Sequence, residues 1–283
     1  MDAPPSEHRP PNLPVGVDVD AIRRVDRVIR PLGRLWFRHE TRGLERVPPG
    51  ATLVVGNHSG GKLPIDAMLF VGDWYRHFEW RRPLYGLSHD MLTGSIRLRA
   101  ALWRAGIVRA SRRNAEGLLG RGDAVIVLPG GEYETFRPWH HRNRIVFGDH
   151  RGFAQVALRT GVPITPFVCI GGHEMFMILA RGERLARRLL PARWRVESFP
   201  ITLGLPFGLY VGPIPAPLPL PSRIVAEVLH PVYLNREEAD HPAWEARHAH
   251  DPVVVARAAR VVTSRMQAAL DRLAAERRWP VVG

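Results

Sequence analysis

The pattern that most restricts the fold of this chain is the alternation of short apolar runs with helical segments, which begins near residue 50. Runs rich in aliphatic and β-branched residues, typical of buried strands, lie at 51–56, 83–88, 107–108, 124–128, 163–170 and 224–229. Apolar residues at helical spacing occupy 63–78, 94–105, 114–119, 152–160, 182–190 and 252–278. Strands that alternate with helices form largely parallel sheets with helices on their faces. The sequence therefore predicts an α/β fold with a mixed, largely parallel sheet flanked by helices.

The 283 residues are enough for one large α/β domain, which we place at 50–283. A Pro-rich segment, 1–18, is predicted to be a disordered arm, and 19–49 an N-terminal amphipathic helical segment. Within it, 21–38 has aliphatic residues at helical spacing surrounded by arginines, and Pro31 is expected to kink or split the helix. This pattern is typical of an interfacial helix and also of a helix packed on the domain with solvated arginines, and both interpretations stay open.

The net charge of the chain indicates that its partners carry negative charge. Lys and Arg total 40 against 27 Asp and Glu, which gives a formal net charge of +13. Nucleic acids and anionic membranes are the usual partners of such an excess. No nucleic-acid-binding motif is recognisable, so we expect no nucleic-acid partner. The first residues do not have the pattern of a signal peptide, and we expect a peripheral protein on the cytoplasmic face of an anionic membrane.

The longest uncharged run, 199–221, is long enough to cross a bilayer but contains seven prolines. Prolines at this density prevent a regular helix, so no ordinary membrane-spanning helix is expected there. The run is a candidate wall for an acyl chain, a candidate membrane contact, or a core hairpin.

A histidine and an aspartate lie where the first buried run ends. His58 follows that strand directly, Gly60 and Gly61 come next, and Pro64 is suited to the first position of a helix that contains Asp66. A carboxylate beside a histidine is the minimal general-base pair. If this stretch were one straight helix, the two residues would be separated by a rise of ~12 Å, so the pair requires a loop after His58. The alternative is that Asp66 only caps its helix and His58 is a structural histidine.

The stretch Asn-His-Ser-Gly-Gly-Lys-Leu-Pro-Ile-Asp-Ala-Met-Leu at 57–69 resembles the signature block of the PlsC-type glycerolipid and lysophospholipid acyltransferase superfamily. Three further blocks resemble those of the family and follow in the same order, at 106–115, 127–134 and 161–166, so the resemblance spans about 50–230. Seven residues separate His58 from Asp66, whereas four is the commonest family spacing. The third block has Pro-Gly-Gly in place of the usual Pro-Glu-Gly-Thr-Arg. Both departures resemble the diacylglycerol-acyltransferase-like branch.

The resemblance implies a PlsC-like fold and an O-acyltransferase that moves a fatty acyl group from acyl-CoA or acyl-ACP to a hydroxyl of a glycerolipid or lysophospholipid. It implies that His58 is the general base and that Asp66 orients it. The implied substrate-binding residues are Asn57, Gly60, Gly61, Arg109, Arg112, Gly130, Gly131, Glu134 and Arg137. Backbone amides near 57–61 or 130–131 are candidates for an oxyanion site. Arg137 is a candidate replacement for the missing phosphate-reading arginine, or else part of a surface ion pair.

We expect no cofactor other than the acyl thioester cosubstrate, and no metal. His140 and His141 are adjacent, and His248 and His250 have no further ligands at metal-binding spacing. A non-catalytic peripheral lipid-binding protein on the same fold remains the alternative function.

Overall fold

A seven-stranded sheet lies at the centre of the molecule. The computed structural model describes residues 13–58, 64–88, 96–189, 199–204, 206, 208–212 and 218–279. In sheet order the strands are β1 (Glu40–Arg42), β10 (Val225–Val228), β6 (Ile164–Ile170), β2 (Thr52–Gly56), β5 (Ala124–Val127), β3 (Leu84–Ser88) and β4 (Ile107–Arg109). The strands from β6 to β4 are mutually parallel, whereas β10 is antiparallel to β6 and parallel to β1. The predicted mixed, largely parallel sheet is confirmed.

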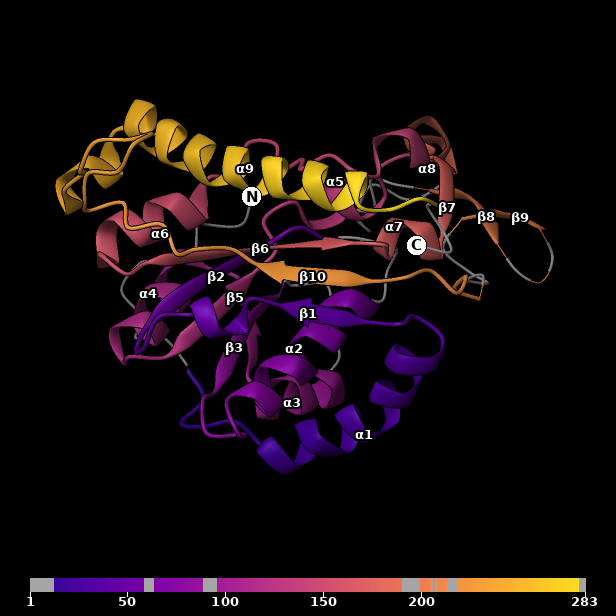
Figure 1. Cartoon of the computed structure of the whole chain (residues 1–283), viewed down its shortest axis with the longest axis horizontal. Coiled ribbons are helices and arrows are strands. Elements are labelled where there is room, and N and C mark those ends of the chain that lie inside the picture. The colour runs from indigo at the N-terminus through magenta and orange to yellow at the C-terminus, as the bar shows by residue number, and fades with distance from the viewer. Residues whose placement is uncertain are drawn as a thin grey trace.

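Helices cover both faces of this sheet (Figure 1). One face carries α4 (Arg112–Gly120), α6 (Gly152–Thr160) and α9 (Pro252–Ala275), and the other carries α1 (Val19–Leu35) and α2 (Ile65–His77), while α3 (Ile96–Arg104) adjoins β4. The long helix α9 begins where the Asp251 side chain accepts hydrogen bonds from two amides of the first turn, and Pro252 occupies the first helical position. Among the helices of the described residues, none has both the length and the apolar character needed to cross a bilayer.

Helix α1 packs on the domain and also keeps an apolar flank exposed. Ile22 and Ile29 pack against the core cluster beneath α2, whereas Val28 and Leu35 are 76% and 84% exposed. The helix is continuous through Pro31, so it is not split there. One flank of α1 thus packs on the domain, whereas its exposed apolar flank fits the pattern of an interfacial helix.

The segment before α1 was predicted to be a disordered arm. Its residues 1–12 lie outside the described residues. Leu13 and Val17 pack against the core, and the Asp18 side chain caps α1 by accepting a hydrogen bond from the Ala21 amide. Residues 13–18 of the predicted arm are therefore part of the packed domain.

A second, three-stranded antiparallel sheet consists of β7 (Met177–Ala180), β8 (Ile201–Gly204) and β9 (Gly208–Val211). It lies beside α7 (Gly172–Met175) and α8 (Glu183–Leu189), at the end of the molecule to which β6 runs (Figure 1). The hairpin expected within 199–221 is thus present. One of its faces is buried through Thr202 and Tyr210, whereas Leu203 and Leu209 on the other face are exposed. It is therefore not wholly a core hairpin.

Candidate active site

His58 lies at the edge of the main sheet where the parallel strands end. It follows β2, whose neighbours are β5 and β6. Ligands of open α/β sheets usually bind outside this edge. Gly56, the last residue of β2, packs against the Phe167 ring so closely that an added Cβ atom would lie 2.1 Å from ring carbons. The residues that follow β5 and β6 are therefore brought against His58, although they are far from it in sequence.

The main chain of His58 is held from two sides. Its N–H donates a hydrogen bond of 2.7 Å to Oε2 of Glu134, and its backbone also hydrogen-bonds to the ring of His173. The preceding residue, Asn57, donates through Nδ2 to the Cys169 carbonyl at 2.9 Å and accepts from the Cys169 N–H at 2.7 Å. Asn57, predicted to bind substrate, is thus buried and occupied in joining the end of β2 to β6.

Glu134 is the central supporting residue of the site. It lies on α5 (Gly131–Thr135), is completely buried, and accepts hydrogen bonds from the Val146 N–H at 3.1 Å and from the Arg137 guanidinium at 2.8 Å. Burial raises the pKa of the Glu134 carboxyl to about 7, although Arg137 and the two amides act in the opposite direction. A Cβ atom on Gly130, the residue before α5, would lie 2.4 Å from Glu134 atoms, so glycine leaves room for the Glu134 side chain there.

Arg137 is a buried partner of Glu134, which contradicts the interpretation of this residue as part of a surface ion pair. Its side chain is only 3% exposed, and besides the ion pair with Glu134 it donates to the Arg142 carbonyl at 3.1 Å. It is therefore not part of a surface ion pair. Its chemical role is to neutralise the carboxylate that holds His58.

Asp66 lies in the first turn of α2, and α2 begins at Ile65, next to the proline predicted to start it. Its side chain is buried, and its charge acts on the nearby Arg137 guanidinium. Asp66 and the His58 segment therefore converge on the same pair, Glu134 and Arg137. The predicted loop and its two substrate-binding glycines, Gly60 and Gly61, lie outside the described residues.

His173 is a site residue that the sequence analysis missed. It lies on α7 directly after β6, is 3% exposed, and its Nε2 atom makes no hydrogen bond within the described part of the chain. Burial, together with the charges of Arg137 and His58, holds the pKa of His173 well below its usual range, so the ring is neutral near pH 7. A histidine shortly after a buried strand is the same signal that identified His58, and it was available in the sequence.

The second block contributes residues that are not adjacent to His58. Arg109 ends β4, which is separated from β2 by β3 and β5. Three strand spacings amount to about 14 Å. Arg109 therefore lies at the same edge of the sheet as His58, where the parallel strands end, but on the outermost strand. Arg112 begins α4 and hydrogen-bonds to Gln155 of α6, which places it in the contact between these two helices. Both arginines are exposed.

Two of the backbone amides that were candidates for an oxyanion site are already engaged. The His58 N–H is bound to Glu134, and the Gly131 N–H donates to the Leu128 carbonyl at 3.3 Å. An oxyanion would have to displace these bonds to reach either amide.

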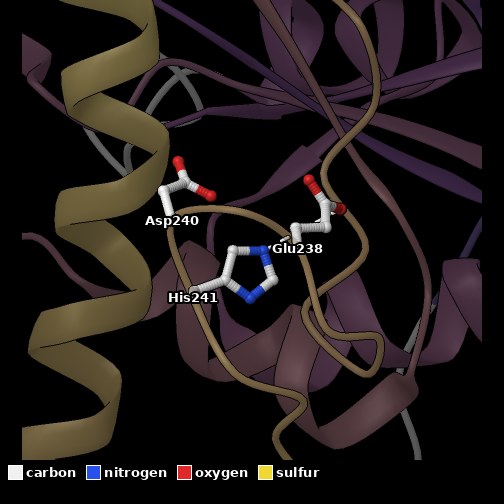
Figure 2. Close-up of side chains that lie close together, drawn as sticks. All are labelled: Glu238, Asp240 and His241. Carbon is white, nitrogen blue, oxygen red and sulfur yellow. Dashed lines mark ion pairs between the residues drawn. The ribbon is translucent and has the colours of Figure 1, made fainter.

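Three potential metal ligands lie together elsewhere, at Glu238, Asp240 and His241 (Figure 2). Arg265 of α9 donates to Asp240 Oδ2 at 2.9 Å and to Glu238 Oε2 at 2.7 Å, and the His241 ring stacks on Trp244. The contacts of Arg265 offset part of the charge of the two carboxylates and join the loop to α9. We therefore interpret this cluster as a structural ion-pair network rather than a metal centre.

Both the sequence and the fold of this chain are similar to those of known proteins. The family model for diacylglycerol acyltransferase matches residues 45–243. An uncharacterized protein of Mycobacterium tuberculosis is 32% identical over 256 residues, which cover 89% of this chain and 67% of that protein. The mouse DGAT1/2-independent enzyme synthesizing storage lipids is 27% identical over 208 residues, which cover 69% of this chain and 57% of the enzyme.

Among solved structures, the 1-acyl-sn-glycerophosphate acyltransferase PlsC from Thermotoga maritima matches with a TM-score of 0.53 and 16% sequence identity. The match covers 92% of this chain and 83% of PlsC. At this identity the likeness is one of fold, and it confirms the predicted PlsC-like architecture.

Proposed function

The chain belongs to the diacylglycerol acyltransferase family and is an acyltransferase, and from this premise we propose that it transfers a fatty acyl group from an acyl thioester to a hydroxyl of a glycerolipid or lysophospholipid at a membrane surface. The donor class we propose is acyl-CoA or acyl-ACP. Family membership decides against the alternative of a non-catalytic lipid-binding protein. It also confirms the placement in the branch with a Pro-Gly-Gly third block.

In the proposed mechanism His58 is the general base and Asp66 orients it. The imidazole removes the proton of the acceptor hydroxyl as the oxygen attacks the thioester carbonyl. The tetrahedral intermediate then collapses, the carbon–sulfur bond breaks, and the departing thiolate takes the proton from the imidazolium. The products are the new ester and the free thiol. General-base assistance of this kind contributes typically ~10²–10⁴-fold to the rate.

The observation that best supports this role is the double attachment of the His58 main chain to Glu134 and His173. A catalytic group must be held close to its productive geometry, because small displacements cost large factors in rate. Two buried residues from different elements hold one histidine, and Asp66, the carboxylate proposed to orient it, is buried in the first turn of the next helix. A purely structural loop histidine does not require this support.

The test is a turnover assay with one labelled acyl-CoA and a panel of lysophosphatidate, other lysophospholipids, monoacylglycerol and diacylglycerol. His58→Ala should lower turnover by at least ~10²-fold with every acceptor that the wild type uses. Asp66→Asn should also lower it, because the imidazolium loses its supporting charge. His230→Ala, which removes an exposed histidine elsewhere, is the control and should behave as the wild type. Near-normal turnover by purified His58→Ala would refute the mechanism.

We also propose that the protein works as a peripheral membrane protein. The exposed flank of α1 contains Val28, Leu35 and Trp36. The Trp36 indole N–H donates to the Pro219 carbonyl at 3.0 Å, which brings the C-terminal end of α1 beside the exposed Leu218. Exposed leucines on the β7–β9 sheet extend the apolar surface. Arginines of α1 and α8 would add attraction to an anionic bilayer of about 1 kcal/mol each.

A further inference from the structure

A polar pocket lies between α1 and α2, and His58 is not among its lining residues. It has a volume of ≈ 250 Å³ and is lined by three arginines, Arg30, Arg34 and Arg76, together with His39, Thr41 and Asp73. Asp73 is seven residues beyond Asp66 on α2, which corresponds to a rise of ~10.5 Å along the helix. The pocket is therefore distinct from the proposed catalytic pair. Its volume is small for a drug-sized or acyl ligand but large for a single water molecule.

One side of this pocket is a preformed hydrogen-bonded network. Asp73 Oδ2 accepts from the His39 ring at 2.8 Å and from the Thr41 hydroxyl, while the Arg76 guanidinium is held by Asp26 and Asp73. Burial alone would raise the pKa of Asp73, but these donors lower it to about 2. His39 has a side chain only 5% exposed. These contacts fix the orientation of Arg76 before any ligand binds.

The other side carries positive charge that the described residues do not neutralise. Arg30 and Arg34 are one helical turn apart on α1, line the same pocket, and form no ion pair within the described part of the chain. Like charges at this spacing destabilise a helix. Of the three arginines that line the pocket, Arg76 is paired with the carboxylates of Asp26 and Asp73, so the excess charge is that of Arg30 and Arg34, and an anion placed beside them would remove it.

We propose that this pocket binds a phosphate group. Guanidinium groups bind phosphate through paired, charge-assisted hydrogen bonds, and arginine suits this geometry better than lysine does. The phosphate is carried either by a soluble compound or by the headgroup of a membrane phospholipid. Its binding would join α1 to α2, since Arg30 and Arg34 belong to α1 and Arg76 belongs to α2. The inference does not depend on the proposed acyl acceptor or on the role of His58.

The experiment compares three proteins: the wild type, Arg30→Gln/Arg34→Gln, and Arg24→Gln/Arg27→Gln. The last removes the same charge from exposed positions of α1 outside the pocket. Inorganic phosphate is titrated calorimetrically at constant ionic strength. In a second arm, cosedimentation is measured with phosphatidylcholine vesicles with and without phosphatidate.

The pocket double variant should bind phosphate at least about tenfold more weakly than the wild type in one or both arms, because it loses two charge-assisted contacts. The control double variant should stay within about twofold of the wild type, as expected for screened surface charges. Loss in the titration alone assigns a soluble phosphate, and loss with phosphatidate vesicles assigns a lipid headgroup. Equal binding by the wild type and the pocket variant in both arms would overturn the proposal. An equal loss in both double variants would do so too, because charge alone would then explain the binding.

Discussion

At the scale of single residues, three side chains hold the main chain of the proposed base, directly or through a partner. Glu134 bonds the His58 amide, Arg137 neutralises Glu134, and His173 bonds the His58 backbone from the other side. A buried ion pair of this kind does not by itself stabilise a protein, because desolvation offsets the attraction between the charges. We therefore interpret the pair as a device that fixes the geometry of His58.

The titration of Glu134 provides a test of this interpretation. Because its pKa is raised from 4.5 in the unfolded chain to about 7, its contribution to stability is fully present below about pH 4.5 and is lost as the pH rises through about 7. Between about pH 5 and pH 8 the free energy of unfolding of the wild type should fall by about 2–3 kcal/mol relative to Glu134→Gln, which does not titrate there. Urea unfolding of both proteins at the two pH values measures this difference. A difference that does not change with pH, or that changes in the opposite direction, would contradict the assignment.

At the scale of elements, the end of β2 is placed by its packing against β6 and α2. The Phe167 ring of β6 stacks on Phe70 of α2 with centroids 4.1 Å apart, and it also lies over Gly56. The strand can approach this aromatic pair only because residue 56 has no side chain. The position of His58, two residues later, follows from this contact.

Gly56→Ala should therefore destabilise the protein by about 1–3 kcal/mol and lower turnover, since an added methyl group would overlap the Phe167 ring and displace the end of β2. Gly120→Ala, at the end of α4, is the matched control, because no atom lies within 4 Å of the position that its added methyl group would occupy. It should be neutral or slightly stabilising, as expected for alanine in a helix. Thermal unfolding and the acyl-transfer assay measure both effects. Equal stability of the two variants would show that β2 tolerates a shift here.

At the scale of the whole molecule, the proposed membrane surface consists of the exposed apolar side chains of α1 and of the β7–β9 sheet. Residues 218–221 contact the C-terminal end of α1, through the bonds of Trp36 to Pro219 and of Arg38 to Pro221, and the Leu220 N–H donates to the carbonyl of Met175 in α7, the helix that precedes β7. The proposed site lies at this end, because β6 runs toward α7 and the small sheet (Figure 1). Deletion of α1 would not test this orientation, since Ile22 and Ile29 belong to the core and their loss would uncover α2.

Substitutions on the exposed flank test it instead. Val28→Asp/Leu35→Asp should lower recovery with anionic liposomes in a flotation assay at least severalfold, because both side chains face solvent and would have to enter the bilayer surface. Val253→Asp changes an exposed valine at the start of α9 and is the control. It should float as the wild type does. Unchanged flotation of the α1 variant would remove this flank from the proposed membrane surface.

The sequence by itself determined the elements whose signals are local. The alternation of apolar runs and helical patterns predicted the principal strands and helices, and the resemblance of four blocks predicted the branch of the acyltransferases, which the family match confirms. His58 and Asp66 were found as candidates because each lies next to the end of an apolar element. By contrast, β1 has only three residues and no periodic pattern, and it is a strand because it pairs with β10, far along the chain.

Only the tertiary structure decided which side chains are buried together. Glu134 is 76 residues from His58, and no local pattern indicates that its carboxylate accepts the His58 amide. Arg137 was a candidate for reading a phosphate or for a surface ion pair, and no local pattern indicated that the fold buries it against Glu134. The pocket between α1 and α2 was not predicted from the sequence either, because along the chain its arginines have the pattern of ordinary solvated charges. The physical reason is that helices and strands follow local spacing, whereas the environment of a charge depends on residues brought near by folding.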